Sequence, residues 1–126
     1  MRSFRATEIF AAHAAQRRDG STIASALRRP NFHVTESVEQ SKAIARIHGG
    51  AIILAGSGMC DGGRIRHHLK ANLWRFDATV LLVGFQSAGT LGRALRDGAS
   101  AVRIYGEEVA VKAEIRTIDV YSGHAD

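Results

Sequence analysis

The strongest constraint on the fold is a pattern that occurs twice in the second half of the chain. Residues 51–55 form a short apolar run, and a loop rich in glycine follows at 56–63. Residues 79–85 form a second apolar run, again followed by a glycine-containing loop at 86–90. Short apolar runs that alternate with helices are typical of parallel strands buried on both faces. The pattern therefore predicts a parallel α/β sheet.

Helix signals follow both loops. We expect Asp61 to cap a helix over residues 62–73, because Asp is a preferred N-cap residue. A residue with a large apolar side chain recurs every fourth position there, which predicts a core-facing stripe made of Ile65, Leu69 and Leu73. Thr90 is expected to cap a second, shorter helix that Gly98 closes.

The remaining segments complete a single domain. Residues 1–50 read as a helical segment, in which Ser37 and Gln40 form a capping box that opens a helix to about His48. Residues 101–105 and 109–111 flank a turn and predict a hairpin, and residues 113–121 predict a last strand. We therefore expect an α/β fold: a mostly parallel, Rossmann-like sheet flanked by helices, with a C-terminal β-hairpin.

Charge favours an anionic partner. The net charge is +5, with 17 Lys and Arg against 12 Asp and Glu. Residues 1–50 carry eight basic against four acidic residues, a balance of +4. Nucleic acid is one such partner, and a solvated basic surface is the alternative. A single cysteine, Cys60, and no signal-like or membrane-spanning run indicate a cytoplasmic protein without a membrane partner.

The 56–63 loop is suited to a phosphate. Its four glycines let backbone N–H groups approach a phosphate closely at the start of a helix. A dinucleotide site requires an acid at the end of the next strand, but that strand ends in Gly84-Phe85-Gln86. A Walker loop requires Gly-Lys-Ser/Thr, and Gly62-Gly63-Arg64 does not supply it. Tight turns account for one or two of the glycines.

Basic side chains follow this loop on the predicted helix. Arg64, His67 and His68 are expected on one flank, where guanidinium and imidazole groups suit phosphate oxygens. Adjacent histidines on a helix diverge by about 100°, so they are poor partners for one metal ion. Loops at the carboxyl ends of parallel strands line a common crevice, so the 56–63 and 86–90 loops are expected to face the same ligand.

The last five residues place a hydroxyl, an imidazole and a carboxylate in one short turn, Ser122-Gly123-His124-Ala125-Asp126. A histidine there can donate or accept a proton near neutral pH. We expect this turn to belong to a larger enzyme from which the chain is a piece.

Taken in order, these motifs resemble the β-CASP branch of the metallo-β-lactamase superfamily, a group of RNA-processing nucleases related to the mRNA 3′-end endonuclease. The resemblance rests on residues 55–64, His67-His68-Leu69, Gly84-Phe85-Gln86, residues 89–93 and residues 122–126. It covers residues 51–126 with specific order and spacing, and residues 1–50 more loosely.

The resemblance implies an RNA-binding lid of a zinc-dependent ribonuclease. The zinc ions of such an enzyme belong to a metallo-β-lactamase domain of the same polypeptide, which is not present here, so this chain is expected to bind no metal and to be inactive alone. His124 would bind the scissile phosphate or protonate the leaving oxygen. The expected substrate-binding residues are Ser57, Gly58, Met59, Arg64, His67, Thr90, Arg93 and Ser122.

Two other functions stay open from the residues alone. One is a stand-alone nucleotide- or phosphate-binding α/β module without catalysis, and the other is a protein-interaction domain without a ligand. Whether the intact enzyme is a homodimer also stays open.

Overall fold

The computed structural model describes Ser25 and residues 28–118. The chain divides into two compact units, Met1–Ser41 and Lys42–Asp126. The part of the expected helical segment before residue 25 and the turn at 122–126 lie outside the described residues. Across the described part, no helix combines the length and the apolar character that crossing a membrane requires.

A capping box opens the first described helix, α3 (Val38–Ala43), as the sequence predicts. The Gln40 backbone N–H donates to Ser37 Oγ at 3.1 Å, and the Ser37 backbone N–H donates to Gln40 Oε1 at 3.3 Å. A 3₁₀ turn, η1 (Ile44–Arg46), follows. The helical path ends at Ile47, whose backbone is extended, and thus before the expected end near His48.

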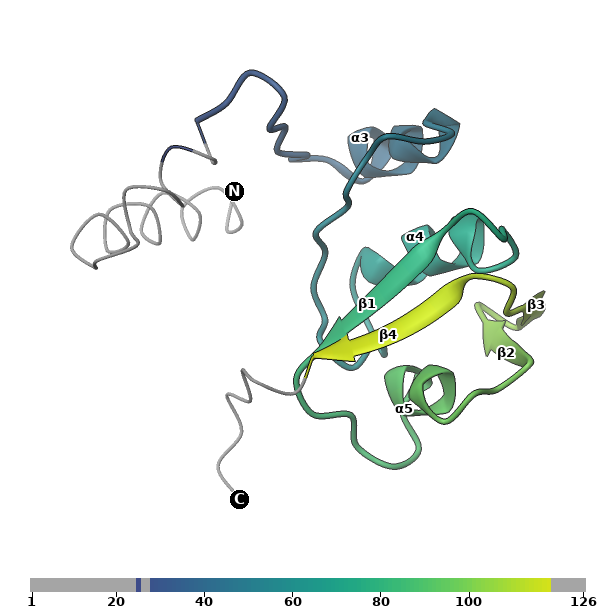
Figure 1. Ribbon diagram of the computed structural model, residues 1–126. Helices are drawn as coiled ribbons and strands as arrows, with labels where there is room; N and C mark the ends of the chain where they lie inside the picture. Colours follow the sequence, from purple (N-terminus) through teal and green to yellow (C-terminus); the bar gives the residue numbers. More distant parts are fainter. Residues whose placement is uncertain (1–24, 26–27, 119–126) are drawn as a thin grey trace. The chain divides into compact units, whose positions relative to one another are not determined.

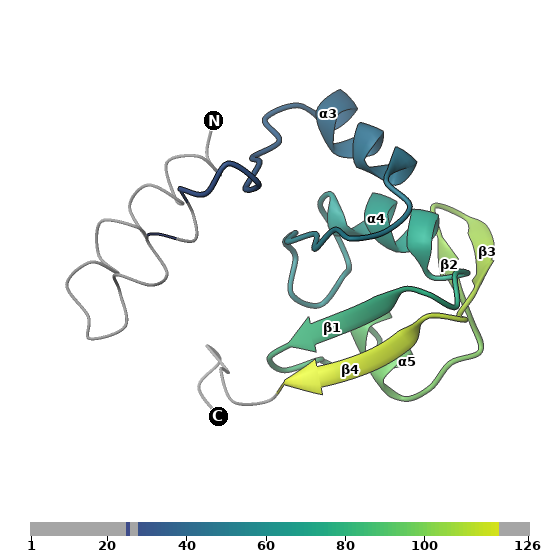
Figure 2. The same cartoon turned by 45° about the horizontal axis from the view of Figure 1, so that its top comes forward.

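The second unit has the predicted α/β fold (Figures 1 and 2). Two of its described strands, β1 (Thr79–Val83) and β4 (Glu114–Ile118), pair in parallel, with Thr79 opposite Glu114 and Val83 opposite Ile118. The helices α4 (Ile65–Asn72) and α5 (Leu91–Arg96) lie along this pair. Because the strands are parallel, both end at the same edge of the sheet, where the 84–90 loop leaves β1.

The expected hairpin is also present, formed by β2 (Ala101–Ile104) and β3 (Glu107–Ala110). A two-residue turn joins them, and both of its residues have positive φ: 51° at Tyr105 and 78° at Gly106. Two-residue turns of this kind match the twist of antiparallel strands.

The core lies on one face of the parallel pair. The stripe predicted for α4 is buried there, with Leu69 and Leu73 almost fully enclosed and Ile65 packed beside them. Other elements contribute the remaining core side chains, which are Cys60, Leu82, Leu95, Val102, Ile104, Val109 and Ala113. Burial of these apolar groups provides the main stabilisation of the unit and fixes the two helices beside the strands.

Two expectations about the strands were wrong. Residues 51–55 do not form a strand within the described structure, and the side chains of Ile52 and Leu54 are 92% and 80% exposed. Strand β1 is buried on one face only, since Leu81 on its other face is 52% exposed. An apolar run becomes a buried strand only when a paired neighbour and a covering layer are present, and the described residues supply neither.

Candidate functional site

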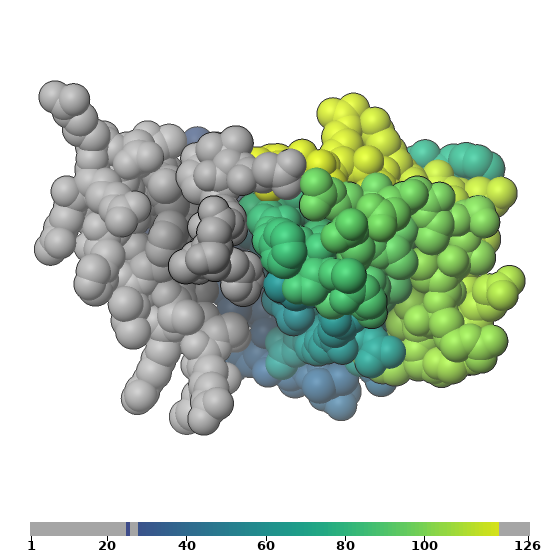
Figure 3. Space-filling view, turned by 90° about the horizontal axis from the view of Figure 1, so that it is seen from below, coloured from purple at the N-terminus to yellow at the C-terminus, as the bar shows by residue number. Residues whose placement is uncertain are grey.

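Three hydrogen bonds tie the 56–63 loop to the segment after β1. The Gln86 Nε2 donates to the Gly58 carbonyl, the Gly92 N–H donates to the Met59 carbonyl, and the Leu91 N–H donates to Asp61 Oδ1, each at 2.9 Å. Their surfaces adjoin in Figure 3, where the first segment is teal and the second is green. The two loops therefore meet where β1 ends, as predicted, although residues 51–55 do not form the strand on which that prediction relied.

Asp61 has a different role from the one expected. The residue at the N-cap of α4 is Arg64, which makes no side-chain cap, and the helix begins only at Ile65. Asp61 instead accepts the N–H of Leu91, the first residue of α5. Thr90 caps the same helix as predicted, because its Oγ1 accepts the Arg93 N–H at 3.2 Å.

Gln86 is the residue that the sequence analysis missed as a site residue. Its side chain is fully buried between the two loops, and its amide is in contact with Gly92. A Cβ at position 92 would overlap Gln86 Oε1 and would lie 3.0 Å from the Met59 carbonyl oxygen. Glycine at this position therefore allows the loop and α5 to approach each other.

Of the four glycines in the 56–63 loop, the fold requires one. Gly63 has φ of 67°, and a Cβ there would lie 3.0 Å from the Gly56 carbonyl oxygen. At Gly56, Gly58 and Gly62 the backbone does not need positive φ, and a Cβ would meet no atom within 4 Å. The described fold gives no reason for glycine at these three positions.

The basic residues of α4 divide between two environments. His68 is buried, and burial, followed by the charges of His67 and Arg64, lowers the pKa of its imidazole from 6.5. His67 is partly exposed, and its ring lies 4.9 Å from that of Tyr105. The Arg66 guanidinium lies over the same tyrosine ring at 4.4 Å. His68 is therefore buried, whereas the sequence predicts it on one flank with Arg64 and His67, available to phosphate oxygens.

The other expected site residues are placed as follows. Ser57 and Gly58 are exposed, and Met59 is half-buried. The Thr90 hydroxyl donates to the Ser87 carbonyl at 2.7 Å. The Arg93 Nε pairs with Asp97 at 2.9 Å. Ser122 and His124 lie outside the described residues.

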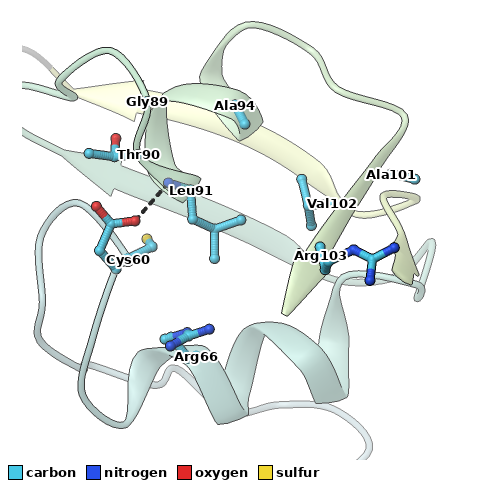
Figure 4. A pocket seen from close by; sticks show the side chains of 10 residues that line it. Cys60, Arg66, Gly89, Thr90, Leu91, Ala94, Ala101, Val102 and Arg103 are labelled. Carbon is cyan, nitrogen blue, oxygen red and sulfur yellow. Dashed lines mark hydrogen bonds between the residues drawn. The ribbon is translucent and has the colours of Figure 1, made fainter. Parts of the chain in front are cut away.

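An open pocket of about 520 Å³ lies beside the junction of the two loops, and residues of α4, α5 and β2 line it (Figure 4). Thr90 is its only member among the expected site residues. Its walls combine apolar groups with two arginines and one acid, and are formed by Cys60, Asp61, Arg66, Gly89, Thr90, Leu91, Ala94, Ala101, Val102 and Arg103. Burial, and then the charge of Asp61, raises the pKa of the Cys60 thiol, so the thiol in this wall is protonated at neutral pH.

Comparison with known proteins identifies the family of this chain. The model of the Beta-Casp domain family matches residues 2–95. The chain belongs to the Beta-Casp family. This confirms the resemblance to the β-CASP branch of the metallo-β-lactamase superfamily.

The relatives of this Beta-Casp chain include a ribonuclease and several transcription termination factors. Ribonuclease TTHA0252 of Thermus thermophilus is 45% identical over 98 residues, which cover 78% of this chain and 23% of that protein. Transcription termination factor FttA of Pyrococcus abyssi is 34% identical over 100 residues, 75% of this chain and 15% of the factor. The Methanosarcina mazei FttA is 31% identical over 100 residues, 75% of this chain and 16% of the factor. The Beta-Casp chain therefore spans less than a quarter of the length of these relatives.

The described part of this Beta-Casp chain does not fit a metal ion. Among Ser25 and residues 28–118, no three His, Cys, Asp or Glu side chains come together as ligands. Structural zinc takes four such ligands and catalytic zinc at least three. We therefore derive no catalytic step through a metal held by these residues.

Proposed function

We propose that this chain is the RNA-binding lid portion of a zinc-dependent β-CASP ribonuclease that hydrolyses RNA phosphodiester bonds. Membership of the Beta-Casp family and the 45% identity to a ribonuclease support this proposal. The lid would act together with a metallo-β-lactamase domain of the same polypeptide, and that domain would hold the zinc ions. The chain alone would then cleave no RNA. We further propose a cytoplasmic location and leave homodimerisation open.

One observation carries the binding role: the three glycines of the loop that the fold does not need. Gly58 is exposed, has no requirement for positive φ, and has open space where a Cβ would be. Glycine at such a position is explained when a ligand approaches the backbone closely. An RNA phosphate suits this approach, because backbone N–H groups can donate to its oxygens.

The proposed contacts begin with this loop. Ser57, Gly58 and Met59 would bind phosphate through the loop itself, and Arg64 would add a guanidinium from the start of α4. Further contacts would come from His67, Thr90, Arg93 and Ser122. His124 would act on the scissile phosphate, a role that rests on the motif at residues 122–126. The net charge of +5 adds long-range attraction for a polyanion.

The substitution Gly58→Ala in the longer protein that contains this chain tests the proposal. A methyl group there meets open space, so the midpoint of thermal unfolding should stay unchanged. RNA affinity should fall by roughly 10-fold, because the added Cβ occupies the space of the ligand. Gly63→Ala is the matched contrast, and it should destabilise the fold itself. Unchanged RNA affinity in a stable Gly58→Ala variant would refute the proposed approach of RNA to this loop.

A further inference from the structure

We propose that Gln86 is a positioning residue, whose amide holds the Gly58–Met59 peptide so that the Met59 N–H is presented to an RNA phosphate oxygen. This inference rests on the proposed function, and it assigns a role to a side chain that cannot itself reach the ligand. Gln86 is 0% exposed, so any effect on binding must pass through the loop that it contacts.

The carbonyls of the 56–63 loop point in a defined direction. The Gln86 Nε2 lies 2.9 Å from the Gly58 carbonyl oxygen and 3.4 Å from that of Gly84. The next loop carbonyl, that of Met59, accepts the Gly92 N–H at 2.9 Å. Two successive carbonyls of the loop therefore face the segment that follows β1.

The amide hydrogen of Met59 points away from Gln86. In a trans peptide the C=O and the N–H point in opposite directions. Because the Gly58 carbonyl faces Gln86, the N–H of Met59 in the same peptide faces away from Gln86. This N–H has no hydrogen-bond acceptor within the described part of the chain. It is thus a donor held in a fixed orientation beside the exposed Gly58, and donors of this kind bind anions.

Packing alone does not explain a glutamine at position 86. Gln86 Oε1 is buried and has no hydrogen-bond partner among the described residues. A buried acceptor without a partner is unfavourable, and a methionine of similar length would fill the space without it. The presence of an amide here is therefore explained by its donor, Nε2, which holds the Gly58 carbonyl.

Gly92 supports the same arrangement from the other side. Only a hydrogen atom at its α-carbon leaves room for the Gln86 amide, since a Cβ would overlap Oε1. Any side chain at position 92 would push the amide away from Gly58. The two residues are consequently predicted to act as a coupled pair.

The test uses Gln86→Met in the longer protein, because methionine preserves the packing while it removes the Nε2 donor and the Oε1 acceptor, of which only the donor has a hydrogen-bond partner among the described residues. The KM for RNA should rise roughly 3–10-fold, the equivalent of one net hydrogen bond. The kcat should change less than about twofold, since the lost contact binds ground state and transition state alike. Gln40→Met, which removes an exposed amide from the capping box of α3, is the control and should leave KM unchanged.

A fall in thermal stability of Gln86→Met with an unchanged KM would show a purely structural role and overturn the inference. A second measurement is the double-mutant cycle with Gly92→Ala. That substitution should raise KM strongly in the parent sequence and much less beside Gln86→Ala, where Oε1 is gone. Additive effects would also overturn the inference. If the unaltered protein neither binds nor cleaves RNA, the proposed function fails as well, whereas normal RNA binding by Gln86→Met refutes the inference alone.

Discussion

Replacing Asp61 with alanine should weaken the junction between the two loops. The carboxylate accepts the Leu91 N–H at 2.9 Å and joins positions 30 residues apart in the chain. Loss of a cap of this kind typically costs about 1 kcal/mol. The site is exposed, which keeps the loss below that of a buried charged hydrogen bond. Thr90 still caps α5 from its own side chain, so the helix itself should persist.

The measurement is thermal and urea unfolding of Asp61→Ala and Asp61→Asn. Alanine should lower the melting temperature by roughly 3–5 °C, as about 1 kcal/mol does for a domain of this size. Asparagine keeps an acceptor oxygen and should lose less than half as much. Asp97→Ala is the control: it removes only an exposed ion pair with Arg93 and should cost about 0.5 kcal/mol or less. Unfolding of Asp61→Ala at the wild-type midpoint, or an equal loss from asparagine, would refute the proposed junction.

Three further predictions concern other residues. Arg64→Ala in the longer protein should weaken RNA binding by roughly 1–3 kcal/mol, measured by fluorescence anisotropy, and an unchanged Kd would exclude Arg64 from the phosphate path. His124→Ala should slow single-turnover cleavage by roughly 10²–10⁴-fold with a smaller change in RNA affinity, and a wild-type rate would leave His124 without a catalytic role. Burial lowers the pKa of His68 below its unfolded value of 6.5, so the folded state binds fewer protons than the unfolded state. Stability should accordingly be full above pH 6.5 and fall as the pH decreases below it, and His68→Gln should flatten this dependence in urea unfolding at several pH values. A slope that the substitution leaves unchanged would assign the effect to another group.

Features set by local sequence could be predicted well. The four-residue spacing of Ile65, Leu69 and Leu73 marked the buried face of α4, because helix geometry alone brings these positions together. Thr90 could be predicted as the cap of α5, because the hydrogen bond from the Arg93 N–H to its side chain joins residues only three positions apart. The meeting of the two loops was also predicted, although residues 51–55 do not form the strand on which that prediction relied. Hydrogen bonds from Gln86, Leu91 and Gly92 hold the 56–63 loop in its place.

Features that depend on distant partners could not be predicted. Asp61 has the same local signature whether it caps the following helix or accepts the N–H of Leu91, and only the folded chain distinguishes them. Gln86 looked like part of a loop motif, and its burial against Gly58 depends on how closely Gly92 allows the segments to approach. The apolar run at 51–55 indicates a segment that favours burial, but the described residues supply no layer to cover it.

The central claim is that RNA lies along the edge where the two loops meet. The most direct test is photo-crosslinking of 4-thiouridine-containing RNA to the longer protein, with mass spectrometry of the crosslinked peptides. The account predicts crosslinks within residues 56–64 and 86–93, and their loss in Gly58→Ala. Crosslinks confined to the β2–β3 hairpin, or an unchanged pattern in the Gly58→Ala variant, would contradict it.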